Sequence, residues 1–117
     1  MNSTPTLAYK ILTAPQMAQL EHDGSFAGAP VDLADGYIHL STADQLTETV
    51  DKHFAGQTEL HIAAVDLDAL GDAVKWEPSR GGQLFPHLYA ALPLDAVTAY
   101  GPLQRDEHGK VRLPVAG

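Results

Sequence analysis

Apolar residues recur along the chain with two different periods, and these periods predict its strands and helices. Residues 59–66 are apolar at nearly every position, which is typical of a central strand buried on both faces. Residues 37–41 instead alternate between polar and apolar side chains, as in a strand with one face turned from the core. We expect about six strands, within 7–13, 37–41, 59–66, 74–77 and 86–91 and in a final hairpin of 97–103 and 110–113.

Two helices are predicted where helical spacing follows a capping-box pattern. Thr13 with Gln16 precedes the first helix, which we expect to end at about residue 22. Thr42 with Gln45 precedes the second helix, whose apolar positions have the spacing of one helix face. Gly56 is expected to end this second helix.

Segments rich in glycine and proline predict loops at 25–36 and 78–82. A chain of 117 residues is long enough to bury one hydrophobic core, so we expect a single domain, 1–117, with its core at about 7–113. Two early helices combined with about six strands predict an α+β fold with a mixed or antiparallel sheet.

The charge of the chain limits the partners that it can bind. The formal net charge is −8, from 15 acidic and 7 basic residues, and the basic residues are scattered. A protein that holds a nucleic-acid backbone needs clustered cations. We therefore expect no long DNA or RNA partner and no binding to an anionic membrane. The sequence leaves the oligomeric state open.

The composition also excludes several kinds of site. The chain has no cysteine, which excludes disulfides, thiolate nucleophiles and thiolate metal sites. The six histidines lack the spacing of metal ligands on a helix, so we expect no metal site. The polar N-terminus does not have the pattern of a signal peptide, and no stretch approaches the ~20 apolar residues of a membrane helix. We expect a cytoplasmic location.

Two predicted strands carry polar side chains on one face. Alternation puts Tyr37, His39 and Ser41 together on the first strand, and His87 with Tyr89 on the second. If the strands adjoin, these side chains form the floor of a cleft rich in hydrogen-bonding groups. We predict that His39 and His87 lie in this cleft. The alternative is that both are half-buried histidines held by backbone carbonyls.

A second concentration of candidate residues lies at 76–82. Arg80 offers paired donors that suit a phosphate or carboxylate, and Trp76 can stack on a base. Glu77 and Ser79 add a carboxylate and a hydroxyl. The alternative is a structural Glu77–Arg80 pair on a turn, with Trp76 in the core. The segment lacks the Gly-Lys-Ser/Thr ending of a phosphate-binding P-loop.

Three phrases of the sequence carry a family resemblance: DGYIHLSTADQ (35–45), KWEPSR (75–80) and LFPHLY (84–89). They strongly resemble a small bacterial family catalogued as domain of unknown function 952, over about residues 9–97. A more remote similarity concerns the order of elements along the chain. A strand with His-Leu-Ser is followed by a helix, then by an apolar strand that ends in Asp, and then by an aromatic residue with Ser and Gly after it. This order resembles the ADP-ribosyltransferase superfamily, and its RNA 2′-phosphotransferase branch in particular.

The remote resemblance implies a split sheet with a cleft for NAD or ADP-ribose. It makes NAD a possible substrate, with no cofactor otherwise required, and a small nucleotide-type ligand the expected partner. Implied catalytic residues are His39, Glu77 and His87, and implied ligand-binding residues are Ser41, Thr42, Trp76, Ser79, Arg80 and Tyr89. Two alternatives stay open, a non-catalytic nucleotide-binding or sensing module and a structural domain with no ligand.

Overall fold

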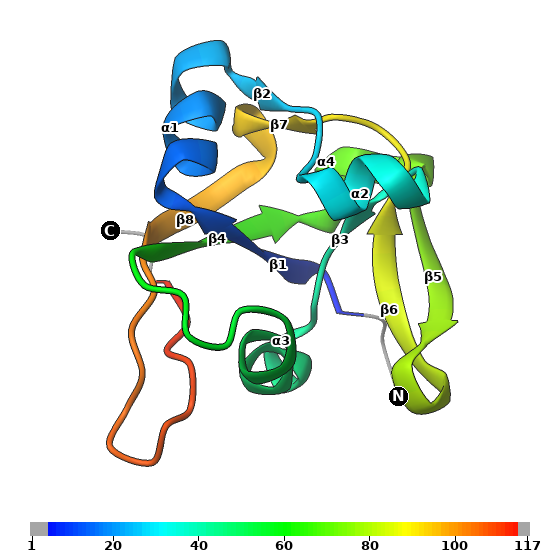
Figure 1. Ribbon diagram of the computed structural model, residues 1–117. Coiled ribbons are helices and arrows are strands. Elements are labelled where there is room, and N and C mark those ends of the chain that lie inside the picture. The colour runs from blue at the N-terminus through cyan, green and yellow to red at the C-terminus, as the bar shows by residue number, and fades with distance from the viewer. Residues whose placement is uncertain (1–4, 115–117) are drawn as a thin grey trace.

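The computed structural model describes residues 5–114, apart from the side chain of Arg80. Its helices are α1 (Ala14–Asp23), α2 (Pro30–Asp35), α3 (Leu46–His53) and α4 (Leu67–Leu70) (Figure 1). Its strands are β1 (Leu7–Thr13), β2 (Ser25–Phe26), β3 (Ile38–His39), β4 (Leu60–Asp66), β5 (Val74–Ser79), β6 (Gln83–Leu88), β7 (Leu92–Pro93) and β8 (Val97–Pro102). Short 3-10 turns occur at Ala43–Gln45, Gly71–Ala73, Arg80–Gly82 and Leu94–Ala96.

The strands form three small antiparallel sheets, in the orders β1-β4-β8, β3-β6-β5 and β2-β7. This confirms the predicted α+β class, with eight strands where about six were expected. Among the described residues, one isolated backbone bridge joins the two three-stranded sheets. There, Tyr9 of β1 and Ser41, just beyond β3, exchange backbone hydrogen bonds of 2.8 and 2.9 Å. Residues on β1 and β3 are thereby held at fixed positions relative to one another.

Strands β1 and β4 of the β1-β4-β8 sheet are buried on both faces, as the sequence predicts for residues 59–66. Helix α1 covers one face and α3 the other (Figure 1). Alternate residues of β1 and β4 therefore enter two separate hydrophobic clusters. The cluster under α1 takes Ala8, Leu12, Ala63 and Val65, and the cluster over α3 takes Tyr9, Ile11, Ile62 and Ala64. Lys10 alternates in step with Ala8 and Leu12, so its side chain leaves the strand on the face covered by α1.

The predicted capping box of α1 is confirmed. The Thr13 backbone N–H donates to Gln16 Oε1 at 2.9 Å, and the Gln16 N–H donates to Thr13 Oγ1 at 3.3 Å. The helix ends at Gly24, whose φ of 73° is the left-handed conformation that glycine adopts without strain. Helix α3 begins one 3-10 turn after Thr42 and ends at His53, earlier than the expected Gly56.

Several predicted boundaries are wrong. Residues 25–36 are not a loop throughout, because they contain β2 and the short helix α2. The strand expected over 37–41 contains only Ile38–His39. The strand expected over 110–113 is reduced to a single bridge between Arg105 and Val111. In these places tertiary contacts decide the backbone pairing, and the local pattern does not.

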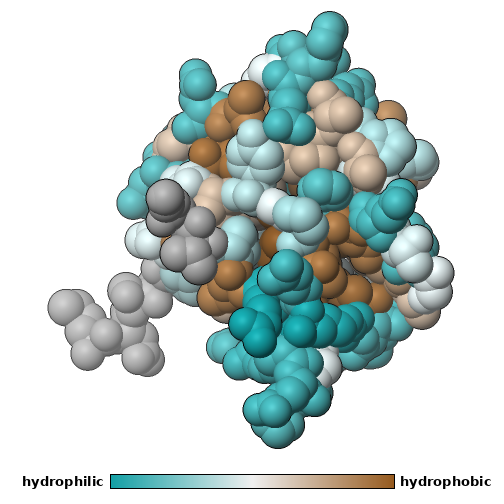
Figure 2. Space-filling model, turned by 90° about the vertical axis from the view of Figure 1, so that its left-hand side faces the viewer, coloured by the Kyte–Doolittle hydropathy of each residue, from teal (hydrophilic) through white to brown (hydrophobic). Residues whose placement is uncertain are grey.

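The surface around α1 and β8 carries scattered apolar residues. Figure 2 shows them as separate brown areas between hydrophilic ones. Scattered apolar exposure is ordinary for a folded protein, because polar groups do not suffice to cover its surface. Among residues 5–114, no helix is long and apolar enough to cross a lipid bilayer.

Candidate functional site

The outer face of the β3-β6-β5 sheet gathers the candidate polar residues. His39, His87 and Lys75 stand opposite one another across the three strands. Their neighbours Ile38, Leu88 and Val74 form the equivalent row on the core side, where they join the main hydrophobic cluster. We call the polar set the histidine face and define it as Tyr37, His39, Lys75, Glu77, His87 and Tyr89. The period-2 pattern of the sequence thus identified most of its members.

The two imidazoles lie together on one face of the sheet, as the alternation predicted. Their ring centroids are 5.7 Å apart, and the ring of Tyr37 stacks on His87 at 4.0 Å with an interplanar angle of 22°. Tyr37 is also 4.7 Å from the ring of His39 and 5.3 Å from that of Tyr89. Tyr37 therefore covers His87, which is only 3% exposed, and links the four rings into one aromatic cluster.

Glu77 holds two members of this cluster through one oxygen. Its Oε1 accepts a hydrogen bond from His87 Nδ1 at 2.8 Å and another from the Tyr89 hydroxyl at 2.7 Å. The bond from Tyr89, followed by that from His87, lowers the pKa of Glu77. The same contact raises the pKa of Tyr89 to about 12. Glu77 is consequently an ionised carboxylate with a side chain that is 37% exposed, so it can meet a ligand.

His39 is held by a buried ion pair. Asp32 of α2, which is 1% exposed, accepts from His39 Nδ1 through Oδ1 at 2.6 Å. Its other oxygen accepts from Lys10 Nζ at 2.9 Å, and Lys10 is itself only 4% exposed. Backbone N–H groups of Ala29 and His39 complete four donors, at 2.7 and 3.1 Å. The carboxylate is therefore fully satisfied in a place that excludes water.

These donors determine the charge of Asp32. Burial alone would raise its pKa, but the hydrogen bond from His39 and the Lys10 ammonium outweigh burial and hold the pKa well below the ordinary range. Asp32 is thus ionised and can only accept hydrogen bonds, so the proton between it and His39 belongs to Nδ1. The opposite ring nitrogen, Nε2, lies 2.9 Å from Oδ2 of Asp35, a residue at the surface.

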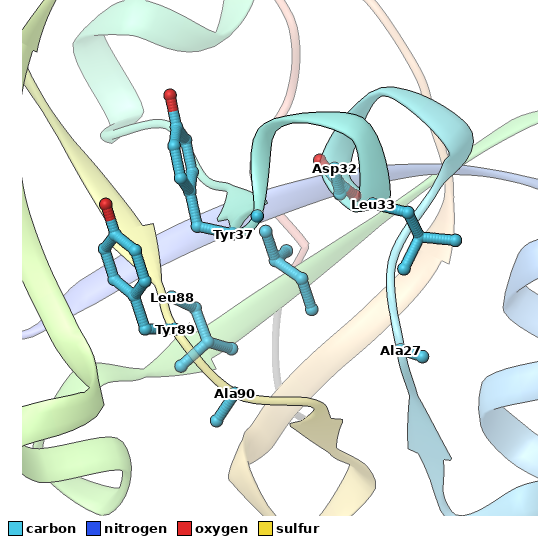
Figure 3. Close-up of a pocket in the computed structure, with 9 residues that line it drawn as sticks. Ala27, Asp32, Leu33, Tyr37, Leu88, Tyr89 and Ala90 are labelled. Atoms are coloured by element: carbon cyan, nitrogen blue, oxygen red, sulfur yellow. The ribbon is translucent and has the colours of Figure 1, made fainter.

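A pocket of about 270 Å³ adjoins the histidine face. Tyr37 and Tyr89 project side by side along one side of it, and Asp32 and Leu33 of α2 lie opposite (Figure 3). Its remaining lining is mostly apolar, from Ala27, Gly36, Ile38, Leu88 and Ala90. Such a pocket suits a flat, mainly uncharged group, with hydrogen-bonding groups at one edge. Neither imidazole is among the residues that line this pocket, although the predicted cleft held both.

Four predicted ligand-binding residues lie apart from the histidine face. Ser41 is buried and its hydroxyl pairs with Thr49 of α3 at 2.9 Å. The N–H of Thr42 donates to Gln45 at 3.0 Å at a helix start. Trp76 alternates to the core side of β5 and packs against the main cluster, as its structural alternative proposed. Ser79 ends β5, paired with Gln83, and the side chain of Arg80 lies outside the described residues.

The sequence interpretation missed Lys10, Asp32 and Asp35. Lys10 interrupts an otherwise apolar strand, and a buried cation requires an acidic partner. That signal was present, but nothing in the sequence selects Asp32 among 15 acidic residues. Gly28 belongs to the same local structure. Its φ is +130°, and a Cβ at this position would lie 2.9 Å from Cβ of Asp32.

We expect Tyr89→Phe to raise the pKa of Glu77 toward its ordinary value. The substitution removes the hydrogen bond that lowers this pKa most and keeps the aromatic ring. Carboxyl carbon NMR over a pH titration measures the change. Tyr37→Phe is the matched control, since it leaves both hydrogen bonds to Glu77 in place. An unchanged Glu77 titration in Tyr89→Phe would contradict the arrangement.

Comparisons with known proteins found one family model and a set of similar solved structures. The model of the family "Protein of unknown function (DUF952)" matches residues 11–100. The crystal structure of protein CC0527 from Caulobacter crescentus is 46% identical and has a TM-score of 0.83, with 92% of this chain and 94% of that chain covered. Its solution NMR structure gives 47% identity and a TM-score of 0.77, with 92% and 91% covered. No curated protein matches the chain.

These relatives carry no stated activity, so the likeness to ADP-ribosyltransferases stays a prediction. Among residues 5–114, no group of three His, Asp or Glu side chains is arranged to hold a metal ion.

Proposed function

The chain belongs to the DUF952 family of proteins of unknown function, and we propose that it is an ADP-ribosyltransferase-like enzyme acting on NAD or another small molecule that contains ADP-ribose. One observation carries the proposal. Two histidines stand side by side on paired strands, each with Nδ1 on a carboxylate, next to an aromatic pocket and an exposed, ionised Glu77. A carboxylate–histidine pair is an arrangement that supports group transfer.

The chemistry fits the groups at hand. When the bond between nicotinamide and ribose breaks, its electron pair leaves with nicotinamide and positive charge develops on the ribose. Glu77 can stabilise this charge, since it is ionised and reaches solvent. With water as the acceptor, the water oxygen bonds to the ribose carbon and releases one proton. His39 would hold a ribose hydroxyl, and Tyr89 would lie against the flat leaving group.

The ligand is expected to be small. Among the basic side chains that the structure describes, Lys75 lies on the histidine face, with Nζ 5.9 Å from the centroid of the Tyr89 ring. Lys10 is buried and committed to Asp32. A long phosphate backbone would need more cations than these. We propose that the guanidinium of Arg80 binds a diphosphate, the role that the sequence predicts for it.

The test is release of nicotinamide from NAD, followed by chromatography. We expect Glu77→Gln to lose about 100-fold in rate, because the amide keeps the hydrogen bonds from His87 and Tyr89 but not the negative charge. Glu107→Gln is the matched control, since Glu107 is an exposed carboxylate in the turn before Val111, outside the histidine face. Equal rates for Glu77→Gln and the wild-type protein would remove Glu77 from the reaction.

A non-catalytic nucleotide-binding module is the second candidate. It is favoured by the engagement of Glu77 with two donors and by the Tyr37 ring that covers His87. Such a module would be stabilised by NAD or ADP-ribose through mass action, with a rise in melting temperature and no release of nicotinamide. If these ligands are not turned over and also do not stabilise the protein, both functions are excluded.

A further inference from the structure

Behind His39 lies a buried ion pair of Lys10 and Asp32. Of the charged groups in residues 5–114, the Lys10–Asp32 pair is the most deeply buried, at 4% and 1% exposure. Burying a pair of charges costs free energy that their attraction repays only with good geometry and further hydrogen bonds. The pair therefore needs an explanation. Its side chains bond to His39 on the histidine face, and the backbone carbonyl of Asp32 accepts from the Tyr37 N–H at 3.2 Å.

The pair touches His39 at three atoms. Asp32 Oδ1 accepts from the ring at Nδ1 and from the backbone N–H of His39, at 2.6 and 3.1 Å. Lys10 Nζ donates to the backbone carbonyl of His39 at 3.2 Å. The ring and the main chain of this residue are thus fixed from two sides. The ring of His87 is held less firmly than that of His39, because its carboxylate partner, Glu77, is partly exposed.

We infer that Lys10 and Asp32 are positioning residues that keep a proton on Nδ1 of His39 and so make Nε2 its working nitrogen. Lys10 holds Asp32 as an anion, and an anionic carboxylate can only accept a hydrogen bond, so Nδ1 must carry the proton and donate it. Proton exchange then takes place at Nε2. In the free protein Nε2 meets Asp35, whose side chain is 45% exposed and can be displaced by a ligand hydroxyl.

This inference specifies the role of His39 and rests on the proposed function only for its effect on turnover. A hydroxyl-bearing ligand, such as a ribose, would meet a ring nitrogen of fixed identity and direction. Orienting a histidine in this way through its opposite nitrogen is a general means of selecting its tautomer. Lys10 is buried, and Asp32, although it lines one side of the pocket, has both oxygens occupied by donors from the protein, so we assign neither a catalytic role.

The test reads the imidazole nitrogens directly by ¹⁵N NMR over a pH titration, with the His39 signals assigned through His39→Gln. In the wild-type protein Nδ1 should keep the shift of a protonated nitrogen at every pH, while Nε2 changes. Asp35→Asn should preserve this pattern, because it removes only the partner of Nε2. Asp32→Asn should move Nδ1 toward the shift of an unprotonated nitrogen, since an amide no longer demands a proton there.

Two results would overturn the inference. One is the finding that neutral His39 in the wild-type protein carries its proton on Nε2. This measurement needs no variant, so it can be made even if Asp32→Asn does not fold. The other is a folded Asp32→Asn with the wild-type nitrogen pattern. If NAD is turned over, Asp32→Asn should also lose ten-fold or more in rate. The expected nitrogen shifts without any turnover would support the positioning role and count against the proposed function alone.

Discussion

Replacing Lys10 by methionine is expected to lower the free energy of unfolding by about 3–5 kcal/mol. Methionine fills a similar volume but leaves the Asp32 carboxylate buried, at 1% exposure, without its ammonium partner. Domains of this size are stable by only about 5–15 kcal/mol, so the loss is a large part of the total. Urea denaturation followed by circular dichroism measures it.

Two further variants separate the buried charge from other effects. Lys52→Met is the matched control, because Lys52 pairs with Glu48 at the surface at 3.3 Å and such pairs contribute about 0–1 kcal/mol. Lys10→Met combined with Asp32→Asn should be more stable than Lys10→Met alone, since no unpaired charge remains. A Lys10→Met protein within about 1 kcal/mol of the wild type would show that the pair is not needed for stability.

The elements predicted best are those with complete local signals. Helix α1 has its cap, its proline and its terminal glycine within residues 13–24, and β4 is apolar at almost every position. Helix α2 has comparable signals, Pro30 at its start and Gly36 at its end, but it is only six residues long, and the glycines around it predict a loop. Short elements depend on their contacts, and a sequence pattern does not reveal these.

The histidine face was predictable because alternation is a local rule. Once β3 and β6 pair, His39 and His87 fall opposite each other. Ser41 escapes this rule because β3 ends at His39 and the backbone turns to pair with Tyr9. Trp76 follows the rule on β5 but faces the core, since its neighbour Glu77 takes the outer side. The alternation predicted each face and left open which side of β5 faced the core.

The support of His39 was not predictable in the same way. Lys10 and Asp32 are 22 residues apart and come from β1 and α2, elements that only the folded chain brings together. Their contact also requires a glycine at position 28, where the chain passes against Asp32. The alternation of the sequence therefore predicted the outer, polar side of the histidine face, while its buried support had to be seen in three dimensions.

Acidification should remove the contribution of Asp32 to stability, in a window set by its pKa in the two states. The folded-state pKa is well below ordinary, and the unfolded value is about 3.9. The unfolded chain thus binds the proton first as the pH falls, so the contribution is complete above about pH 5 and declines below about pH 4, by up to ~1.4 kcal/mol per pH unit.

Denaturation at pH 6, 4 and 3 measures this, with Lys10→Met/Asp32→Asn as the reference that has no carboxyl there. The lowered pKa values of Glu77 and Asp106 act in both proteins and cancel in the difference. A difference between the two proteins that stays constant down to pH 3 would mean that Asp32 titrates alike in both states, and that the buried network does not hold its charge.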